Sequence, residues 1–147
     1  MGLFSRGTDD GLSPISQERL KQILDREGWR YFVDNEGDLG GIWDPAVFYF
    51  MIRGKKKELL FMQSLWRSHP DSSHLEDVRL CIEDWHRDRI WPKCFYRIDD
   101  DGDLRVGTAH AIDWEQGATD AQLLQQIKTM VGTSAEFYKA LGERLGI

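Results

Sequence analysis

The residues that could hold a metal ion are concentrated in two short acidic segments, residues 34–38 and 99–103. A calcium-binding EF-hand loop needs oxygen ligands at its first, third and fifth positions and glycine at its sixth. Counted back from Gly102, the first position is Arg97, and in the other segment the same count reaches Phe32. Neither side chain can bind calcium, so we expect two exposed acidic turns and no metal site.

The histidines, cysteines and serines are not arranged as in known catalytic or zinc-binding motifs. Four histidines and two cysteines are present, and none has the spacing of a zinc-binding helix or finger. Cys81 lies in an apolar helical stretch, which favours a packed thiol over a nucleophile. No GxSxG motif and no phosphate-binding glycine motif occurs. The sequence therefore predicts no catalytic residue, no cofactor and no metal.

Length and charge narrow the class of protein further. The chain has 147 residues, enough for one domain, and a net charge of −6. A nucleic-acid-binding protein would show a basic field, and no apolar run approaches the roughly 20 residues of a membrane span. Two reduced cysteines are typical of the cytoplasm. We expect a cytoplasmic protein with a flexible tail at residues 1–12 and a single domain at 13–147, without nucleic-acid or membrane partners.

The acidic segments belong to a repeated nine-residue motif that specifies a turn. Residues 31–39 and 96–104 are identical at five positions and similar at three others. Asp34 and Asp99 can each bond their own backbone, and a glycine three residues later can adopt positive φ. This pattern is typical of a type I turn that closes a hairpin with a bulge. The repeat therefore predicts two β-hairpins of the same design.

Hydrophobic periodicity predicts three helices and up to six strands. The first helix begins after Ser16 and ends at Gly28, the second covers residues 74–90, and the third follows Thr119 and could break at Gly132. The expected strands are residues 29–33, 39–43, 47–53, 58–66, 93–98 and 104–113. In the order α-ββββ-α-ββ-α, these elements predict an α+β fold with an antiparallel sheet of five to six strands.

The two central strands, residues 47–53 and 58–66, are apolar on both faces. A sheet with one covered face would alternate apolar and polar residues, and each large apolar side chain left in water forgoes roughly 1.5–3 kcal/mol. The second face must therefore be covered by the protein's own helices, a second copy or a client protein. On one face, several side chains end in polar groups, which suit a protein interface that retains some water. The candidate protein-contact residues of this face are Tyr49, Met51, Arg53, Phe61 and Gln63.

A second candidate surface is the segment of residues 85–93, which combines tryptophan and arginine, the types enriched at protein-binding hot spots. The alternative is structural, because tryptophan suits the rim of a core and an arginine can pair with Glu83 or Asp84 on its own helix. The candidate contact residues of this segment are Trp85, Arg87, Arg89 and Trp91.

Five segments resemble the YbjN-domain proteins, in particular their actinobacterial branch. They are WRYFVD at 29–34, GDLGGIW at 37–43, FYF at 48–50, WHRDRIWPK at 85–93 and GATDAQL at 117–123. The resemblance extends over about residues 15–145. It implies a fold similar to type III secretion chaperones, with helices packed on an antiparallel sheet, and a role as a bacterial sensory transduction regulator. It brings no catalytic residues, and the family often carries Asn at the position of His86.

These observations lead to three hypotheses. In the first, the protein is a non-enzymatic, chaperone-like or regulatory module that binds a client through apolar sheet surface. The same surface could pair two copies as a homodimer. In the second, the protein is a small-ligand sensor or enzyme with a pocket lined by Trp85, Trp91 and His110. In the third, it is a purely structural subunit whose partner is its own copy.

Overall fold

Three helices and a six-stranded antiparallel sheet make up residues 11–147, the part of the chain that the computed structural model describes. The helices are α2 (Gln17–Glu27), α3 (Leu75–Asp88), which follows the 3-10 turn η1 (Ser72–His74), and α4 (Asp120–Leu145). The strands are β1 (Phe32–Val33), β2 (Leu39–Trp43), β3 (Ala46–Arg53), β4 (Leu59–Trp66), β5 (Lys93–Ile98) and β6 (Leu104–Asp113). The predicted α+β class and the order α-ββββ-α-ββ-α are confirmed. The tail predicted at residues 1–12 lies outside the described residues except for its last two.

The boundaries differ from the predictions where tertiary contacts decide them. The strand expected at 29–33 shortens to the two residues of β1, and α3 ends at Asp88 because Arg89 is extended at φ −129° and ψ 152°. The break considered at Gly132 does not occur, because α4 is continuous. Buried side chains on both sides of Gly132, Met130 and Ser134 among them, keep α4 on the core through this position.

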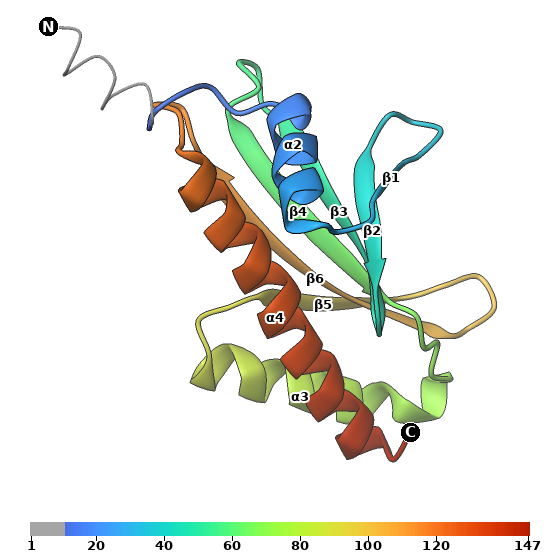
Figure 1. Cartoon of the computed structure of the whole chain (residues 1–147). Helices are drawn as coiled ribbons and strands as arrows, with labels where there is room; N and C mark the ends of the chain where they lie inside the picture. The colour runs from blue at the N-terminus through green and yellow to red at the C-terminus, as the bar shows by residue number, and fades with distance from the viewer. Residues whose placement is uncertain (1–10) are drawn as a thin grey trace, which may run out of the picture.

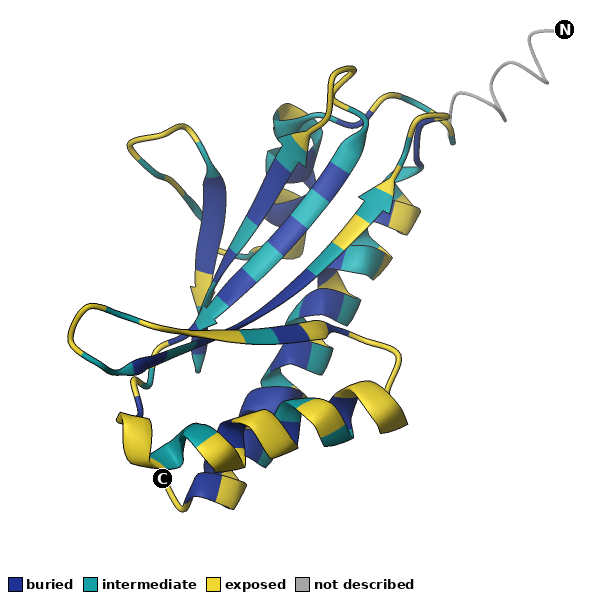
Figure 2. Cartoon of the chain, turned by 180° about the vertical axis from the view of Figure 1, so that it is seen from behind, coloured by how far each residue is buried: buried dark blue, intermediate teal, exposed yellow. Residues whose placement is uncertain are grey.

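Within residues 11–147, helices cover one face of the sheet, whose strand order is β1-β2-β3-β4-β6-β5. In Figure 1, α2 and α4 lie across this covered face, and α3 runs beside β5 at the edge of the sheet and packs against α4. Figure 2 shows the opposite side, where the described chain places no helix over β2, β3 or β4. The core lies between the covered face and the helices. Its strand residues, all almost fully buried, include Phe48, Phe50, Leu60 and Met62.

The repeated motif forms two turns with the same hydrogen bonds. In the first, Asp34 Oδ1 accepts the N–H groups of Glu36 and Asp38, each at 2.9 Å. In the second, Asp99 Oδ1 accepts the N–H groups two and four residues later, at 2.9 and 3.0 Å. Gly37 and Gly102 have φ of 84° and 83°. The prediction of two equivalent hairpin turns with a left-handed glycine is confirmed.

Four hydroxyl groups join α4 to the covered face inside the core. Ser64 of β4 is bonded to Thr108 of β6 and, at 2.7 Å, to the phenol of Tyr138 on α4. Thr108 is bonded to Ser134 at 2.7 Å. All four residues are fully or almost fully buried, and burial raises the pKa of Tyr138 to about 12. Each hydroxyl finds a partner among the others, so this polar cluster is compatible with the core.

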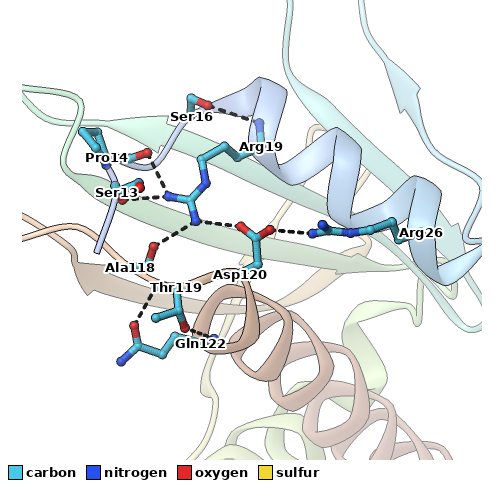
Figure 3. Close-up of polar contacts among 9 residues, drawn as sticks. All are labelled: Ser13, Pro14, Ser16, Arg19, Arg26, Ala118, Thr119, Asp120 and Gln122. Atoms are coloured by element: carbon cyan, nitrogen blue, oxygen red, sulfur yellow. Dashed lines mark hydrogen bonds and ion pairs between the residues drawn. The ribbon is translucent and has the colours of Figure 1, made fainter. Parts of the chain in front are cut away.

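An ion-pair network fastens α2 to the beginning of α4 (Figure 3). The Arg19 guanidinium donates to the carbonyl of Ala118 and to the carboxylate of Asp120, which also accepts from Arg26 at 2.7 Å. Hydrogen bonds from Arg26 and Arg19 lower the pKa of Asp120. Thr119 and Gln122 form a capping box at the same helix end. The network therefore fixes the position of the first helix on the covered face.

Candidate functional site

The most prominent candidate site is the face of the sheet that no described helix covers, which we call the open face. The strand pairing brings Tyr49 of β3, Gln63 of β4 and Ala109 of β6 into one row across it. Burial alternates strictly along β4, where the residues on the open face are half-buried and those on the covered face are almost fully buried. The larger apolar side chains of the open face are Phe32, Ile42, Val47, Met51, Leu59, Phe61, Leu65 and Phe95.

The open face is hollowed into a depression of about 800 Å³. Its lining includes Tyr49, Met51, Gln63 and Leu65 from the two central strands. The acidic turn of residues 34–38 and Arg97 of β5 also line it, although they come from opposite ends of the strand order. The sheet is therefore curved enough for both of its sides to border one concave surface.

A glycine lies beneath a phenylalanine near each edge of the open face. A Cβ atom at Gly40 would lie 2.7 Å from Cζ of Phe32, and one at Gly107 would lie 2.5 Å from Cζ of Phe95. Each phenylalanine belongs to an edge strand and folds inward over its cross-strand neighbour. Phe32 also meets Tyr49 edge to face, with ring centroids 5.8 Å apart. The two glycines thus allow aromatic rings to flank the depression.

Charged side chains are placed unequally around the depression. Arg53 lies over Met51, with its guanidinium nitrogen 3.1 Å from the sulfur, and pairs with Asp38 at 3.3 Å. On the other side, Arg97 and Arg105 are cross-strand neighbours. The Nε–H of Arg105 is buried without a hydrogen-bond partner among the described residues, and its ion pair with Asp99 is long, at 4.0 Å. One flank is therefore mainly acidic and the opposite flank is cationic.

The structure divides the nine predicted contact residues between two surfaces. Those from the central strands lie together on the open face, as the alternation predicted. They are Tyr49, Met51, Arg53, Phe61 and Gln63. Met51 is only 8% exposed because Arg53 lies over it. The other four lie around the end of α3, on the side of the helices. Whether either group binds a protein remains a prediction.

Three of the four residues in the second group are engaged within the chain itself. Trp85 is buried against Phe137 of α4, and its indole N–H donates to the carbonyl of Trp91 at 2.9 Å. The guanidinium of Arg89 lies over the Trp85 ring, 4.5 Å from its centroid. Arg87 pairs with Asp84 at 3.1 Å, as the structural alternative expected. Trp91, by contrast, is 41% exposed.

A second depression, of about 420 Å³, lies beside Trp91. Its lining includes Trp91, His86 and His110, whereas Trp85 does not border it. Trp91 and His110 meet edge to face at 6.2 Å, and burial lowers the pKa of His110 against the opposing effect of a hydrogen bond with Gln126. The Trp-lined pocket of the second hypothesis is therefore present in part, with two of its three expected residues.

Residues 11–147 contain neither a metal-binding cluster nor a membrane-spanning helix. Within this range, no three histidine, cysteine or carboxylate side chains converge as a metal site would require. None of the helices placed there combines the length and the apolar character needed to cross a bilayer. Cys81 and Cys94 are free and buried, and desolvation raises the pKa of both thiols, which disfavours the reactive thiolate.

Residues that sequence reasoning did not select also line the site. Leu65, Phe95, Arg97 and Arg105 all lie on the open face, and the turn of residues 34–38 forms its acidic border. The strand alternation of residues 93–98 and 104–113 could have placed Phe95 and the two arginines on one face. Their approach to the central strands could not have been found in this way, because it depends on the curvature of the sheet.

An antiparallel sheet with helices over one face and a hollowed, uncovered second face defines the class of this α+β protein. Within that class, the chain belongs to the YbjN family. The family's sequence profile, described as "Putative bacterial sensory transduction regulator", matches residues 16–143. The resemblance found in the sequence is therefore confirmed over nearly the whole described chain.

A solved structure shares this fold. The crystal structure of YbjN from E. coli, described as "a putative transcription regulator", is similar with a TM-score of 0.69 and 15% sequence identity. The likeness covers 88% of this chain and 90% of that one. At this identity it establishes the fold alone. No curated protein sequence matches the chain.

Proposed function

We propose that this protein is a regulatory, chaperone-like module that binds another protein molecule through its open face. The bound molecule is a client or a second copy, and binding needs no catalysis, cofactor or metal. The family's description as a sensory transduction regulator supports a regulatory role. The two buried free thiols fit action in the reducing cytoplasm.

One observation carries the proposal, which is an uncovered sheet face with large apolar side chains at its centre. Phe61 and Leu65 are only partly buried there, while their neighbours Leu60 and Met62 are fully buried under the helices. A face that had no partner would gain solubility from polar residues at these positions. Covering each such side chain contributes part of the roughly 1.5–3 kcal/mol of its full burial.

Affinity capture with a matched pair of variants tests the proposal. Tyr49→Glu places a carboxylate in the middle of the open face, and Ile90→Glu places the same charge on an 85% exposed residue beside α3. We expect the wild type and Ile90→Glu to enrich one and the same protein from native lysate, and Tyr49→Glu to lose it. Circular dichroism and thermal unfolding must show that all three proteins are folded.

The variants also separate the two candidate surfaces. Loss of capture by Ile90→Glu alone would move the interface to residues 85–93 and refute the role of the open face. Light scattering of the purified wild type detects a second copy as the partner. A dimer that dissociates with Tyr49→Glu supports self-association through the open face, and a dimer that persists refutes it.

A small-ligand sensor is the second candidate function, and the depression beside Trp91 favours it. A half-buried imidazole at His110, with a lowered pKa, next to an indole ring is typical of a ligand-binding pocket. In this case a small molecule would co-purify with the wild type and with Tyr49→Glu, and would be lost with Trp91→Ala. Mass spectrometry of the heat-released supernatant would decide between the two functions.

A further inference from the structure

Each edge of the sheet is partly obstructed against the addition of a strand. The edge strand β1 has only two residues, too few to template a partner strand. At the other edge, α3 runs beside β5, and Nε2 of His86 accepts the backbone N–H of Cys94 at 2.8 Å. That N–H points away from β6 and is one of the groups an added strand would need. The open face is therefore the surface of the sheet on which a partner meets the least obstruction.

A helix is the element best suited to lie across an apolar sheet face. An extended segment placed there would turn its backbone N–H and C=O groups toward apolar side chains, which leaves some of them without partners. A helix pairs these groups within itself and presents only side chains. The chain uses this solution on its covered face, where α2 and α4 pack on Phe48 and Phe50. The hollow of about 800 Å³ gives the open face the concave shape that receives a convex helix.

The charges around the depression define the polar flanks of such a helix. On one side stand Glu36, which makes no ion pair within the described residues, and Asp34. On the opposite side stand Arg97 and Arg105, and the buried Nε–H of Arg105 needs an acceptor. Opposite charges placed across an interface set orientation and specificity. A complementary helix carries cations on one flank and carboxylates on the other.

The geometry points to an amphipathic α-helix of a partner protein as the occupant of the open face. Its aliphatic stripe covers Tyr49, Gln63 and Leu65, its Lys or Arg flank meets the turn of residues 34–38, and its Asp or Glu flank meets Arg97 and Arg105. This inference rests on the proposed function and narrows it from any protein partner to one class of segment.

Designed peptides of about 18 residues test the inference, because this length suffices for an isolated helix. The first peptide has leucines at helical spacing, lysines along one flank and glutamates along the other. The second has the same composition with the leucines redistributed so that no stripe remains. A third keeps the stripe and has lysine on both flanks. Calorimetry gives the Kd of each peptide, and amide chemical shifts of labelled protein locate its binding site.

We expect the first peptide to shift the amides of Tyr49, Gln63 and Leu65, and to bind roughly tenfold more tightly than the other two. Glu36→Lys and Arg97→Glu should each weaken it roughly tenfold. Glu76→Lys and Arg79→Glu make the same charge changes on the exposed surface of α3 and should have no effect. Equal affinity for the first two peptides, or no binding at the open face, would overturn the inference.

The outcomes also distinguish this inference from the proposed function. If Tyr49→Glu abolishes capture of a partner but the first peptide does not bind, the open face binds protein in another form and only the helix is wrong. If light scattering shows a dimer that Tyr49→Glu dissociates, the occupant is a second copy and the inference fails. Failure of both capture and peptide binding removes the proposed function as well.

Discussion

Individual polar residues hold the helices on the covered face of the sheet. Inside the core, Tyr138 of α4 meets Ser64 of β4, and at the surface Asp120 receives Arg19 and Arg26 of α2. Such groups fix the register of packed elements, because displacement by one residue would leave a buried donor or acceptor unpaired. Local sequence patterns could not predict either contact, since each joins residues more than 70 positions apart.

Removal of the Tyr138 hydroxyl should destabilise the fold. Tyr138→Phe leaves the Ser64 hydroxyl without one of its buried partners, and we expect a loss of about 1–3 kcal/mol in urea unfolding. Tyr96→Phe removes a more exposed phenol and should change stability by less than roughly 0.5 kcal/mol. Equal stability of Tyr138→Phe and the wild type would show that the buried network contributes nothing.

Burial of Tyr138 also implies that the stability of the fold decreases at alkaline pH. Its folded pKa is raised from 10.0 to about 12, so the neutral phenol is favoured by folding. The stabilising contribution is therefore complete below pH 10 and is lost as the pH rises toward 12. Ultraviolet titration of phenolate should show fewer tyrosines ionising near pH 10 in the wild type than in unfolded protein, with Tyr138 among those that stay protonated.

The ion-pair network at Asp120 should contribute at neutral pH and vanish in acid. Because Arg26 and Arg19 lower the folded pKa of Asp120 below its ordinary value of 3.8, the charged form is favoured by folding. Asp120→Asn should therefore lower the melting temperature at pH 7, and the difference from wild type should shrink as the pH falls below 3.8. Asp100→Asn, at an exposed turn, is the matched control and should show no such convergence. A constant difference at all pH values would contradict an electrostatic origin.

At the scale of the elements, the two hairpin turns are the most autonomous parts of the fold. The same nine-residue motif forms both turns, with Gly37 and Gly102 at almost equal positive φ. The helices show the opposite behaviour, because Gly132 lies within α4, where the surrounding core overrides its helix-breaking tendency. The same residue type therefore has opposite roles in the two settings.

Alanine substitution of these glycines should change stability in opposite directions. Gly37→Ala forces a Cβ into the left-handed region and should cost roughly 1–2 kcal/mol. Gly132→Ala adds a methyl group where no atom lies within 4 Å, and should stabilise the protein by roughly 0.5–1 kcal/mol. Thermal unfolding of both variants tests the pair. Destabilisation by Gly132→Ala would show that α4 needs this glycine.

The sequence predicted best what local patterns determine. Both turns, the ends of α2 and the limits of β5 and β6 follow from capping residues, glycines and strand alternation. The length of β1 and the hydrogen bond from Cys94 to His86 depend on how the elements pack in three dimensions, so local patterns could not predict them. In the candidate site, alternation placed Tyr49 and Gln63 on the correct face, whereas the approach of Arg97 required the curvature of the sheet.

Considered as a whole, the molecule buries the two faces of its sheet to different extents. The covered face contributes stability through almost fully buried side chains such as Phe48. On the open face, the burial of Phe61 by the described chain is incomplete. Residues retained for binding commonly contribute less to stability than residues of the core.

Truncation of one phenylalanine on each face should reveal this division. Phe48→Ala should cost about 3–5 kcal/mol. Phe61→Ala should cost less than that, because part of its ring is already in contact with water. Denaturant unfolding measures both values. A similar cost for the two variants would show that the open face is part of the stabilising core.

The partly obstructed edges of the sheet have a further consequence for solubility. A molecule that displays an apolar β-sheet surface is at risk of pairing edge to edge into fibrils. Here α3 and the imidazole of His86 obstruct the edge at β5, and the shortness of β1 limits pairing at the other edge. Such obstruction lowers the tendency to recruit further strands, which makes an apolar open face easier to tolerate in a crowded cell.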